Sequence, residues 1–187
     1  MSALAHEHQA INLSQGYPGF EPDPTLLKKV SKAMKSGANQ YAPMAGNLQL
    51  RKEVNQTFER RDSVSFNPES EITITAGATQ AIFTAIQALL KEEDEVILFS
   101  PAYDCYAPAI ELTGATIVNI TLPHPSYEVP WEEVQKVMNR KTKMIVVNTP
   151  HNPTGAIWRQ SDWDRLAQPS SEDPNISTIP AALTCSR

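Results

Sequence analysis

The residues best suited to chemistry lie in the loop 148–155, whose sequence is Asn-Thr-Pro-His-Asn-Pro-Thr-Gly. This loop follows the apolar run 143–147, which is typical of a buried strand. Its two prolines fix φ and remove backbone donors, and Gly155 permits positive φ, so the backbone is stiff. Open α/β sheets bind ligands beyond the carboxyl ends of their strands. We therefore expect the loop to hold the Asn152 side chain facing a ligand, although Asn-Pro and Thr-Gly are also ordinary turn dipeptides.

A candidate anion site lies in the segment 73–80, Thr-Ile-Thr-Ala-Gly-Ala-Thr-Gln, between an expected strand and an expected apolar helix. Gly77 lets the backbone approach a ligand closely. The unpaired N–H groups of the helix start, the helix dipole and the Thr79 hydroxyl favour a bound anion. A plain glycine turn with a helix cap explains the same residues. The G-x-x-x-x-G-K pattern of a Walker A loop is absent.

These segments resemble the fold-type-I aminotransferases, which use pyridoxal phosphate (PLP). The loop matches their N-x-x-x-N-P-T-G signature, the segment 73–80 is similar to their phosphate cup, and Ser-Pro-Ala-Tyr at 100–103 matches the position of an aromatic residue that stacks on the cofactor. The resemblance implies that the amide of Asn152 binds the phenolic oxygen of PLP. The implied cofactor-binding residues are Gly77, Ala78 and Thr79 for the phosphate, Tyr103 for the ring, and Asn152.

Two N-terminal segments extend the resemblance. The segment 12–18, Asn-Leu-Ser-Gln-Gly-Tyr-Pro, is similar to the substrate side of these enzymes, which implies that Gly16 borders the substrate carboxylate and Tyr17 lines the pocket. Asn-Gln-Tyr at 39–41 implies that Tyr41 reaches the cofactor phosphate of the partner subunit in a homodimer. The matches follow the family order over about residues 11–168 and look closest to the methionine and kynurenine aminotransferases.

The amine that this chemistry needs is missing from the sequence. PLP enzymes use a lysine that forms a Schiff base with the cofactor, and the family carries it in an S-x-x-K motif downstream of N-P-T-G. None of the nine lysines lies beyond Lys143, and Lys28 belongs to an expected surface helix. A D-x-Y motif is absent as well, since Asp173 is followed by Pro-Asn, and the terminal Arg187 lacks the context of a substrate-binding arginine. We therefore expect no catalytic residue here and weak or absent PLP binding by this chain.

Strands and helices alternate from residue 71 onward, which favours a parallel sheet with crossover helices. We expect a truncated α-β-α sandwich, the major domain of PLP-dependent transferases. Expected domains are a small-domain segment with substrate and dimer contacts (1–45), part of the PLP-binding domain (46–168) and an irregular tail unlike the family (169–187). The patterns predict helices over 25–36, 47–61, 78–90, 103–112, 130–139 and 161–168, and strands over 71–75, 95–99, 115–122 and 143–148.

Composition narrows the possible partners. A net charge of −5 argues against nucleic acid or an anionic membrane as a partner, and no apolar run reaches membrane-spanning length. The N-terminus lacks the apolar core of a signal peptide. Cys105 and Cys185 have no metal-site spacing, and His6 and His8 near the chain end are expected to be solvated, so we expect no metal and a cytoplasmic protein with reduced thiols.

The leading hypothesis is amino-group transfer between an amino acid and a 2-oxo acid through PLP, by an enzyme of which this chain is an inactive N-terminal fragment. A PLP-dependent carbon–sulfur lyase is an alternative, because the two reactions share their early carbanion step. A non-catalytic fragment that pairs with full-length subunits through the Tyr41 region is another. The absence of G-x-G-x-x-G and Walker A motifs disfavours a nucleotide-binding domain.

Overall fold

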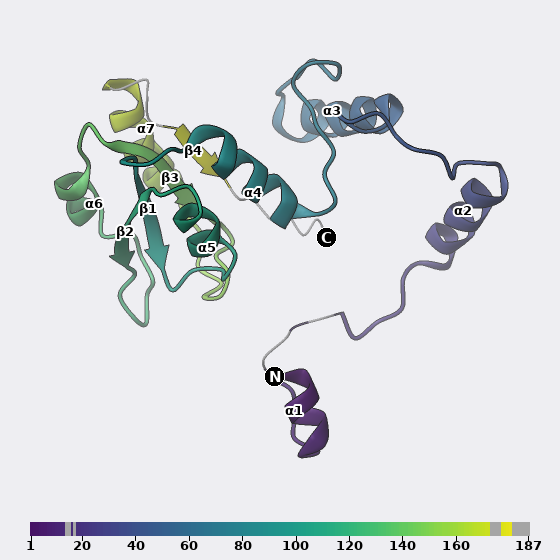
Figure 1. The fold of residues 1–187 in the computed structure, drawn as a ribbon, viewed down its shortest axis with the longest axis horizontal. Helices are drawn as coiled ribbons and strands as arrows, with labels where there is room; N and C mark the ends of the chain where they lie inside the picture. Colours follow the sequence, from purple (N-terminus) through teal and green to yellow (C-terminus); the bar gives the residue numbers. More distant parts are fainter. Residues whose placement is uncertain (14–15, 17, 173–176, 181–187) are drawn as a thin grey trace. The chain divides into compact units, whose positions relative to one another are not determined.

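The computed structural model describes residues 1–13, 16, 18–172 and 177–180. The chain divides into two compact units, Met1–Asn47 and Leu48–Arg187. The second unit contains a parallel four-stranded sheet and the helices packed on it (Figure 1). In the part of the chain that is described, no helix is long and apolar enough to cross a membrane.

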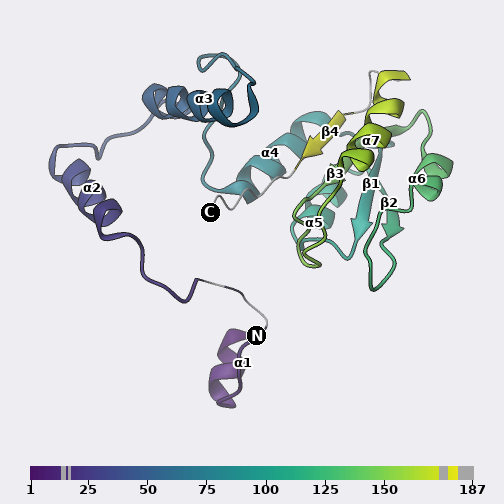
Figure 2. The same cartoon turned by 180° about the vertical axis from the view of Figure 1, so that it is seen from behind.

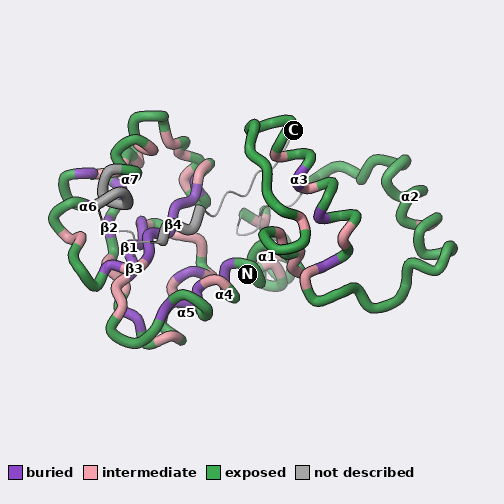
Figure 3. The backbone as a smooth tube through the Cα atoms, turned by 90° about the horizontal axis from the view of Figure 1, so that it is seen from above, coloured by how far each residue is buried: buried purple, intermediate pink, exposed green. Residues whose placement is uncertain are grey.

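The first unit contains two helices, α1 (Ser2–Glu7) and α2 (Pro24–Lys35). Helix α2 confirms the predicted element and begins with Pro at its first turn, where the Asp23 carboxylate accepts from the Thr25 N–H at 2.6 Å. It ends before Gly37, whose φ of +91° supplies the expected stop. Its apolar stripe is uncovered (green in Figure 3), since the exposed fractions of Leu26, Leu27, Val30 and Met34 lie between 50% and 57%.

The sheet has the strand order β2-β1-β3-β4, and every adjacent pair is parallel. The strands are β1 (Glu95–Ser100), β2 (Thr116–Thr121), β3 (Thr142–Val147) and β4 (Ser177–Pro180). The apolar runs of β1 and β3 are buried because these strands lie in the middle of the sheet and are covered on both faces. The edge strand β2 carries the polar Asn119 and is more exposed.

Helices cover both faces of the sheet (Figures 1 and 2). On one face α4 (Ala78–Leu89) and α5 (Tyr106–Glu111) pack against alternate strand residues such as Leu98 and Val146. On the other face α6 (Trp131–Val137) and α7 (Gln160–Glu172) pack against the residues in between, such as Ile97 and Ile145. This is the expected α-β-α sandwich with a parallel sheet.

Helix α3 (Leu48–Asp62) is fixed to the segment that follows it. The buried Arg51 donates through Nη1 to the carbonyl oxygens of Pro68 and Glu69, at 2.7 and 3.2 Å. The Asn55 side chain accepts from the Phe66 N–H at 2.7 Å. These bonds hold the segment between α3 and α4 against α3.

The predicted strand 71–75 is wrong, because the structure has no strand there. Ile72 and Ile74 are half-buried, as an alternating strand requires, but the described residues offer no neighbouring strand with which this segment could share backbone hydrogen bonds. Helix α5 begins at Tyr106 rather than 103, because a turn with the Tyr106 N–H donating to the Tyr103 carbonyl (3.3 Å) precedes it.

The C-terminal segment also differs from the expectation. Helix α7 begins at Gln160, one residue before the predicted start, and it continues to Glu172, past the predicted end at 168. Residues 177–180 form β4, which pairs with β3 from Met144 to Val147. β3 pairs with β1 on one side, and its other side offers free backbone N–H and C=O groups. A short segment without a clear strand pattern in its sequence can pair there, as residues 177–180 do. Cys185, Asp173 and Arg187 lie outside the described residues.

Candidate functional site

Two predicted segments leave the carboxyl edge of the sheet. The neighbouring strands β1 and β3 run in parallel, so the loop that starts at Pro101 and the loop 148–155 leave the same edge. Helix α4 packs on one face of the sheet through Ile82 and Ile86, and its first turn, after Gly77, lies at the end of the helix away from the strands (Figure 1). This topology brings the loops of Tyr103 and Asn152 to one edge, whereas a place for the start of α4 at that edge stays a prediction.

The loop 148–155 is closed by its own hydrogen bonds. The His151 N–H donates to the Ala156 carbonyl at 2.8 Å, and the Gly155 N–H donates to the His151 carbonyl at 2.6 Å. The Trp158 N–H donates to the Thr149 hydroxyl at 3.0 Å. Gly155 has a φ of +76°, the conformation for which the sequence provides a glycine. Asn152 is exposed, so its side chain is available to a ligand.

The side chain of His151 helps to hold this loop. Its ring is buried, and Nδ1 lies 2.8 Å from the Thr154 hydroxyl. Burial lowers the pKa of His151, because the charged imidazolium loses its hydration. The neutral ring is therefore the form that supports the loop.

The start of α4 has the features of an anion site. Gly77 is the N-terminal cap with φ +91° and ψ 165°, a conformation that is essentially restricted to glycine, and no side chain caps the helix. The Gln80 side chain reaches back and accepts from the Ala76 N–H at 2.6 Å, which fixes the turn. The N–H groups of Ala78 and Thr79 belong to the first helical turn, where no intrahelical carbonyl satisfies them. Both residues are exposed and available to a ligand.

Tyr103 stands in the turn that follows β1. It is half-buried against the sheet core, and its ring contacts that of Tyr106 edge-on, with centroids 5.8 Å apart. Tyr106 is buried, and its hydroxyl has no hydrogen-bond partner in the part of the chain that the structure describes. Desolvation raises the pKa of Tyr106 to about 12.

Asn148, the residue after β3, is the first Asn of the N-x-x-x-N-P-T-G pattern, but the sequence assigned it no role. Only 4% of its surface is exposed, and among the described residues neither its Oδ1 nor its Nδ2 has a hydrogen-bond partner. A buried amide without partners is uncommon, because its desolvation is not compensated. The sequence could not reveal it, since pairing depends on what folds around the residue.

The predicted substrate-side and dimer residues belong to the first unit. Gly16 and Tyr41 are both exposed there, and nothing lies within 4 Å of the position of a Gly16 Cβ. Tyr17 lies outside the described residues. The roles assigned to these three residues therefore stay predictions.

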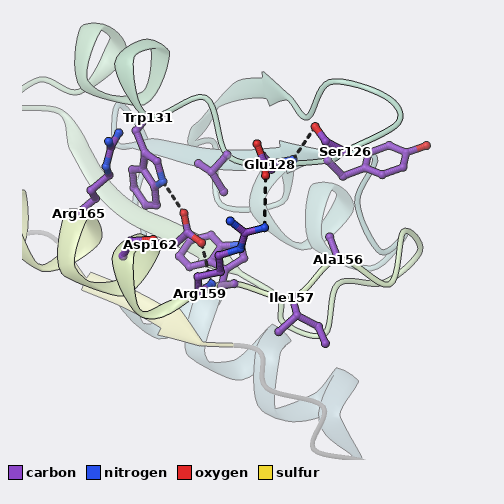
Figure 4. A pocket seen from close by; sticks show the side chains of 12 residues that line it. Ser126, Glu128, Trp131, Ala156, Ile157, Arg159, Asp162 and Arg165 are labelled. Carbon is purple, nitrogen blue, oxygen red and sulfur yellow. Dashed lines mark hydrogen bonds and ion pairs between the residues drawn. The ribbon is translucent and has the colours of Figure 1, made fainter.

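A pocket of about 480 Å³ lies on the α6 and α7 face of the sheet (Figure 4). Its wall includes Trp131, whose Nε1 donates to Asp162 at 2.8 Å, and the pair Glu128–Arg159, at 3.8 Å. Trp158 also lines the pocket, and its ring centroid lies 5.5 Å from that of Trp131 and 5.2 Å from that of Trp163. None of the predicted cofactor residues lines it, so the expected site and this cavity are separate features.

No group of three or more His, Cys, Asp or Glu side chains that could hold a metal occurs among the residues that are described. Cys105 is a free thiol, and burial raises its pKa.

A parallel α-β-α sandwich with a proline-rich asparagine loop beyond the carboxyl ends of its strands has the arrangement in which open α/β sheets bind ligands. The family model for "Aminotransferase class I and II" matches residues 8–176. The chain belongs to this family, whose members use pyridoxal phosphate.

The chain is similar to several aminotransferases. It is 45% identical over 168 residues to a methionine aminotransferase of Escherichia coli K12, covering 90% of this chain and 44% of that protein. Identity to human kynurenine–oxoglutarate transaminase 3 is 36%, covering 88% of this chain and 38% of that protein. The chain spans less than half the length of these curated relatives.

Solved structures give the same picture. A methionine aminotransferase structure from Escherichia coli superposes with a TM-score of 0.91 at 43% identity, covering 96% of this chain and 47% of that one. The N-succinyldiaminopimelate aminotransferase of Mycobacterium tuberculosis superposes with a TM-score of 0.90 at 32% identity, with the same coverages.

The chemistry of the predicted cofactor residues fits PLP. A phosphate needs N–H donors at a helix start, the flat ring needs an aromatic surface, and the polar ring substituents need amides. The turn at Gly77, the ring of Tyr103 and the side chain of Asn152 carry these groups, and their binding of PLP stays a prediction. The unpaired amide of Asn148 shows that this edge also holds hydrogen-bonding capacity that the described residues leave unused.

Proposed function

We propose that the protein to which this sequence belongs transfers an amino group between an amino acid and a 2-oxo acid with PLP, and that this 187-residue chain supplies part of its cofactor site. The observation that carries the proposal is the common edge of the sheet from which the loops of Tyr103 and Asn152 leave.

When bound, PLP supplies the electron sink that stabilises negative charge at the substrate Cα. The N–H groups of Ala78 and Thr79 bind the phosphate, and Gly77 leaves room for it. Tyr103 covers one face of the ring and excludes water. Asn152 donates a hydrogen bond to the phenolic oxygen and so orients the ring.

The further roles come from the family resemblance. Gly16 borders the substrate carboxylate, Tyr17 lines the substrate pocket, and Tyr41 contacts the cofactor phosphate of a partner subunit in a homodimer. A cytoplasmic location stays a prediction from the cysteine content. The division into a small-domain segment (1–45), a PLP-binding part (46–168) and a tail unlike the family (169–187) is likewise a proposal.

The 187-residue chain by itself does not transaminate under this proposal, because no lysine follows Lys143. Transamination by the purified chain above a PLP-only blank would contradict this part of the account. The products distinguish the two reactions in a longer protein that contains the lysine. The 2-oxo acid of the substrate without ammonia indicates amino-group transfer, whereas pyruvate with ammonia indicates carbon–sulfur lysis.

A binding titration tests the site itself. Pyridoxine 5′-phosphate carries the ring and the phosphate but no aldehyde, so it does not react with the nine lysines. We expect weak saturable binding that Asn152→Ala reduces, and no change with Asn139→Ala, which alters an exposed asparagine at the other end of β3. Equal affinity of Asn152→Ala and the unsubstituted chain would remove Asn152 from the site.

A second candidate, a fragment that pairs with full-length subunits, is favoured by the exposure of the first unit. Tyr41 is fully exposed, and the apolar stripe of α2 is uncovered. Apolar side chains at this spacing are typical of a helix face that packs against another surface. Co-purification with an intact homologue supports this candidate, and a strictly monomeric chain in the presence of that homologue contradicts it.

A further inference from the structure

Asn148 differs from the other buried polar residues of the second unit. Asn55, Thr142 and His151 each make side-chain hydrogen bonds, and Arg51 makes two through Nη1. Asn148 makes none with either amide atom, although its exposed fraction is only 4%. Leaving a buried donor and acceptor unpaired destabilises a fold, so the residue type is not explained by the stability of this chain.

The position of Asn148 connects it to the carboxyl edge. Side chains alternate along a strand, so Asn148 continues the row of Met144 and Val146, which face α4 and α5. The register pairs Leu98 with Val146, so Asn148 stands level with Ser100, the last residue of β1. Asn148 is the first residue of the loop 148–155, which also carries Asn152.

Tyr106 supports this reading of the edge. It is the first residue of α5, the helix that leads back to the start of β2, so it lies toward the carboxyl edge on the same face of the sheet. Its buried hydroxyl has no hydrogen-bond partner either. Two buried polar groups without partners thus occur on one face at one end of the sheet.

We infer that Asn148 is a ligand-binding residue of this edge, and that its carboxamide is left unpaired within the chain because it hydrogen-bonds polar atoms of the bound cofactor. This inference rests on the function proposed above and adds a residue to the site. It also makes a claim about the free chain, namely that the amide lowers its stability.

The test compares two variants at opposite ends of β3. Asn148→Leu removes the unpaired amide at nearly constant shape, and Thr142→Val removes a hydroxyl that accepts from the Asn139 N–H at 3.0 Å. Melting temperatures are measured without ligand, and pyridoxine 5′-phosphate is titrated into each protein to millimolar concentration. Asn148→Ser, a smaller polar substitution, is measured alongside.

We expect Asn148→Leu to melt at a higher temperature than the unsubstituted chain and to bind the phosphate ester at least about tenfold more weakly. Thr142→Val should melt at a lower temperature and bind with unchanged affinity. Asn148→Ser should also bind more weakly, which keeps the inference testable if the leucine variant does not fold.

Two results overturn the inference. Unchanged affinity of Asn148→Leu and Asn148→Ser would leave the proposed function standing and remove Asn148 from the site. A lower melting temperature of Asn148→Leu would show that the amide is satisfied in the free chain, for example by water. Failure of the unsubstituted chain to bind would overturn the cofactor site and this inference together.

Discussion

His151 makes the loop 148–155 sensitive to pH. Burial lowers its pKa in the folded chain, so the fold favours the neutral ring. This stabilisation is complete above the pKa of an unfolded histidine, about 6.5, and is lost as pH falls through the lower pKa of the folded state. We expect the melting temperature to fall as the pH is lowered below the pKa of an unfolded histidine.

Replacing the ring should remove part of this dependence. His151→Gln is expected to show a flatter profile of melting temperature between neutral and mildly acidic pH, whereas His124→Gln, which changes an exposed histidine, should leave the profile unchanged. Identical profiles for His151→Gln and the unsubstituted chain would show that burial of His151 is not coupled to stability.

Tyr106 makes the stability of the fold sensitive to alkaline pH. Its pKa is raised to about 12 because burial disfavours the phenolate. The corresponding stabilisation is present below about pH 10, the pKa of a tyrosine in the unfolded chain. It is lost as the pH rises toward the pKa of Tyr106 in the folded chain. Ultraviolet absorbance should show a phenol that ionises near pH 12, and Tyr106→Phe should remove this step without lowering the melting temperature, since the hydroxyl has no partner among the described residues.

At the scale of elements, the start of α4 depends on one backbone conformation. Gly77 has φ +91° and ψ 165°, and nothing lies within 4 Å of the position of its Cβ. Gly77→Ala should therefore cost about 1–3 kcal/mol of stability through strain rather than collision, and should weaken binding of pyridoxine 5′-phosphate because the turn shifts.

Gly114 provides the matched control. It has φ +80° in the turn between α5 and β2, and a Cβ there would meet Glu92 at 3.4 Å. Gly114→Ala should lose stability by a similar amount, as denaturant unfolding measures it, while phosphate-ester affinity stays unchanged. Equal loss of affinity in both variants would mean that Gly77 acts only through overall stability.

The elements whose signals are local could be predicted from the sequence. Apolar runs mark β1 and β3, and the start and stop signals of α2 lie at Pro24 and Gly37. Segment 71–75 and strand β4 were misassigned because strands need neighbours, and neighbours are a property of the fold. The motifs assigned roles to Asn152 and Gly77, whereas a role for Asn148, although it begins the same motif, required knowledge of its burial and its unpaired amide.

At the scale of the whole molecule, the two units differ in what holds them together. The second unit has apolar side chains on both faces of its sheet, including Ile97 and Leu98. In the described part of Met1–Asn47 no apolar side chain is buried. Burial of apolar surface is the main stabilising contribution in folding, so the first unit has little stability of its own.

Hydrogen exchange should show this difference directly. We expect amides of Met1–Asn47 to exchange nearly as fast as in an unfolded chain, and those of β1 and β3 to exchange only through cooperative opening. An added full-length homologue should slow exchange in α2 if its apolar stripe is an interface. Strong protection of α2 in the isolated chain would contradict this account.

The cofactor site is tested most directly by a nuclear magnetic resonance titration of the labelled chain with pyridoxine 5′-phosphate. The account predicts amide shifts that saturate together at Ala78, Thr79 and Tyr103 and in the loop 148–155, with the residues of α6 unaffected. Shifts that are absent, or that are confined to the pocket around Trp131 and Asp162, would contradict it.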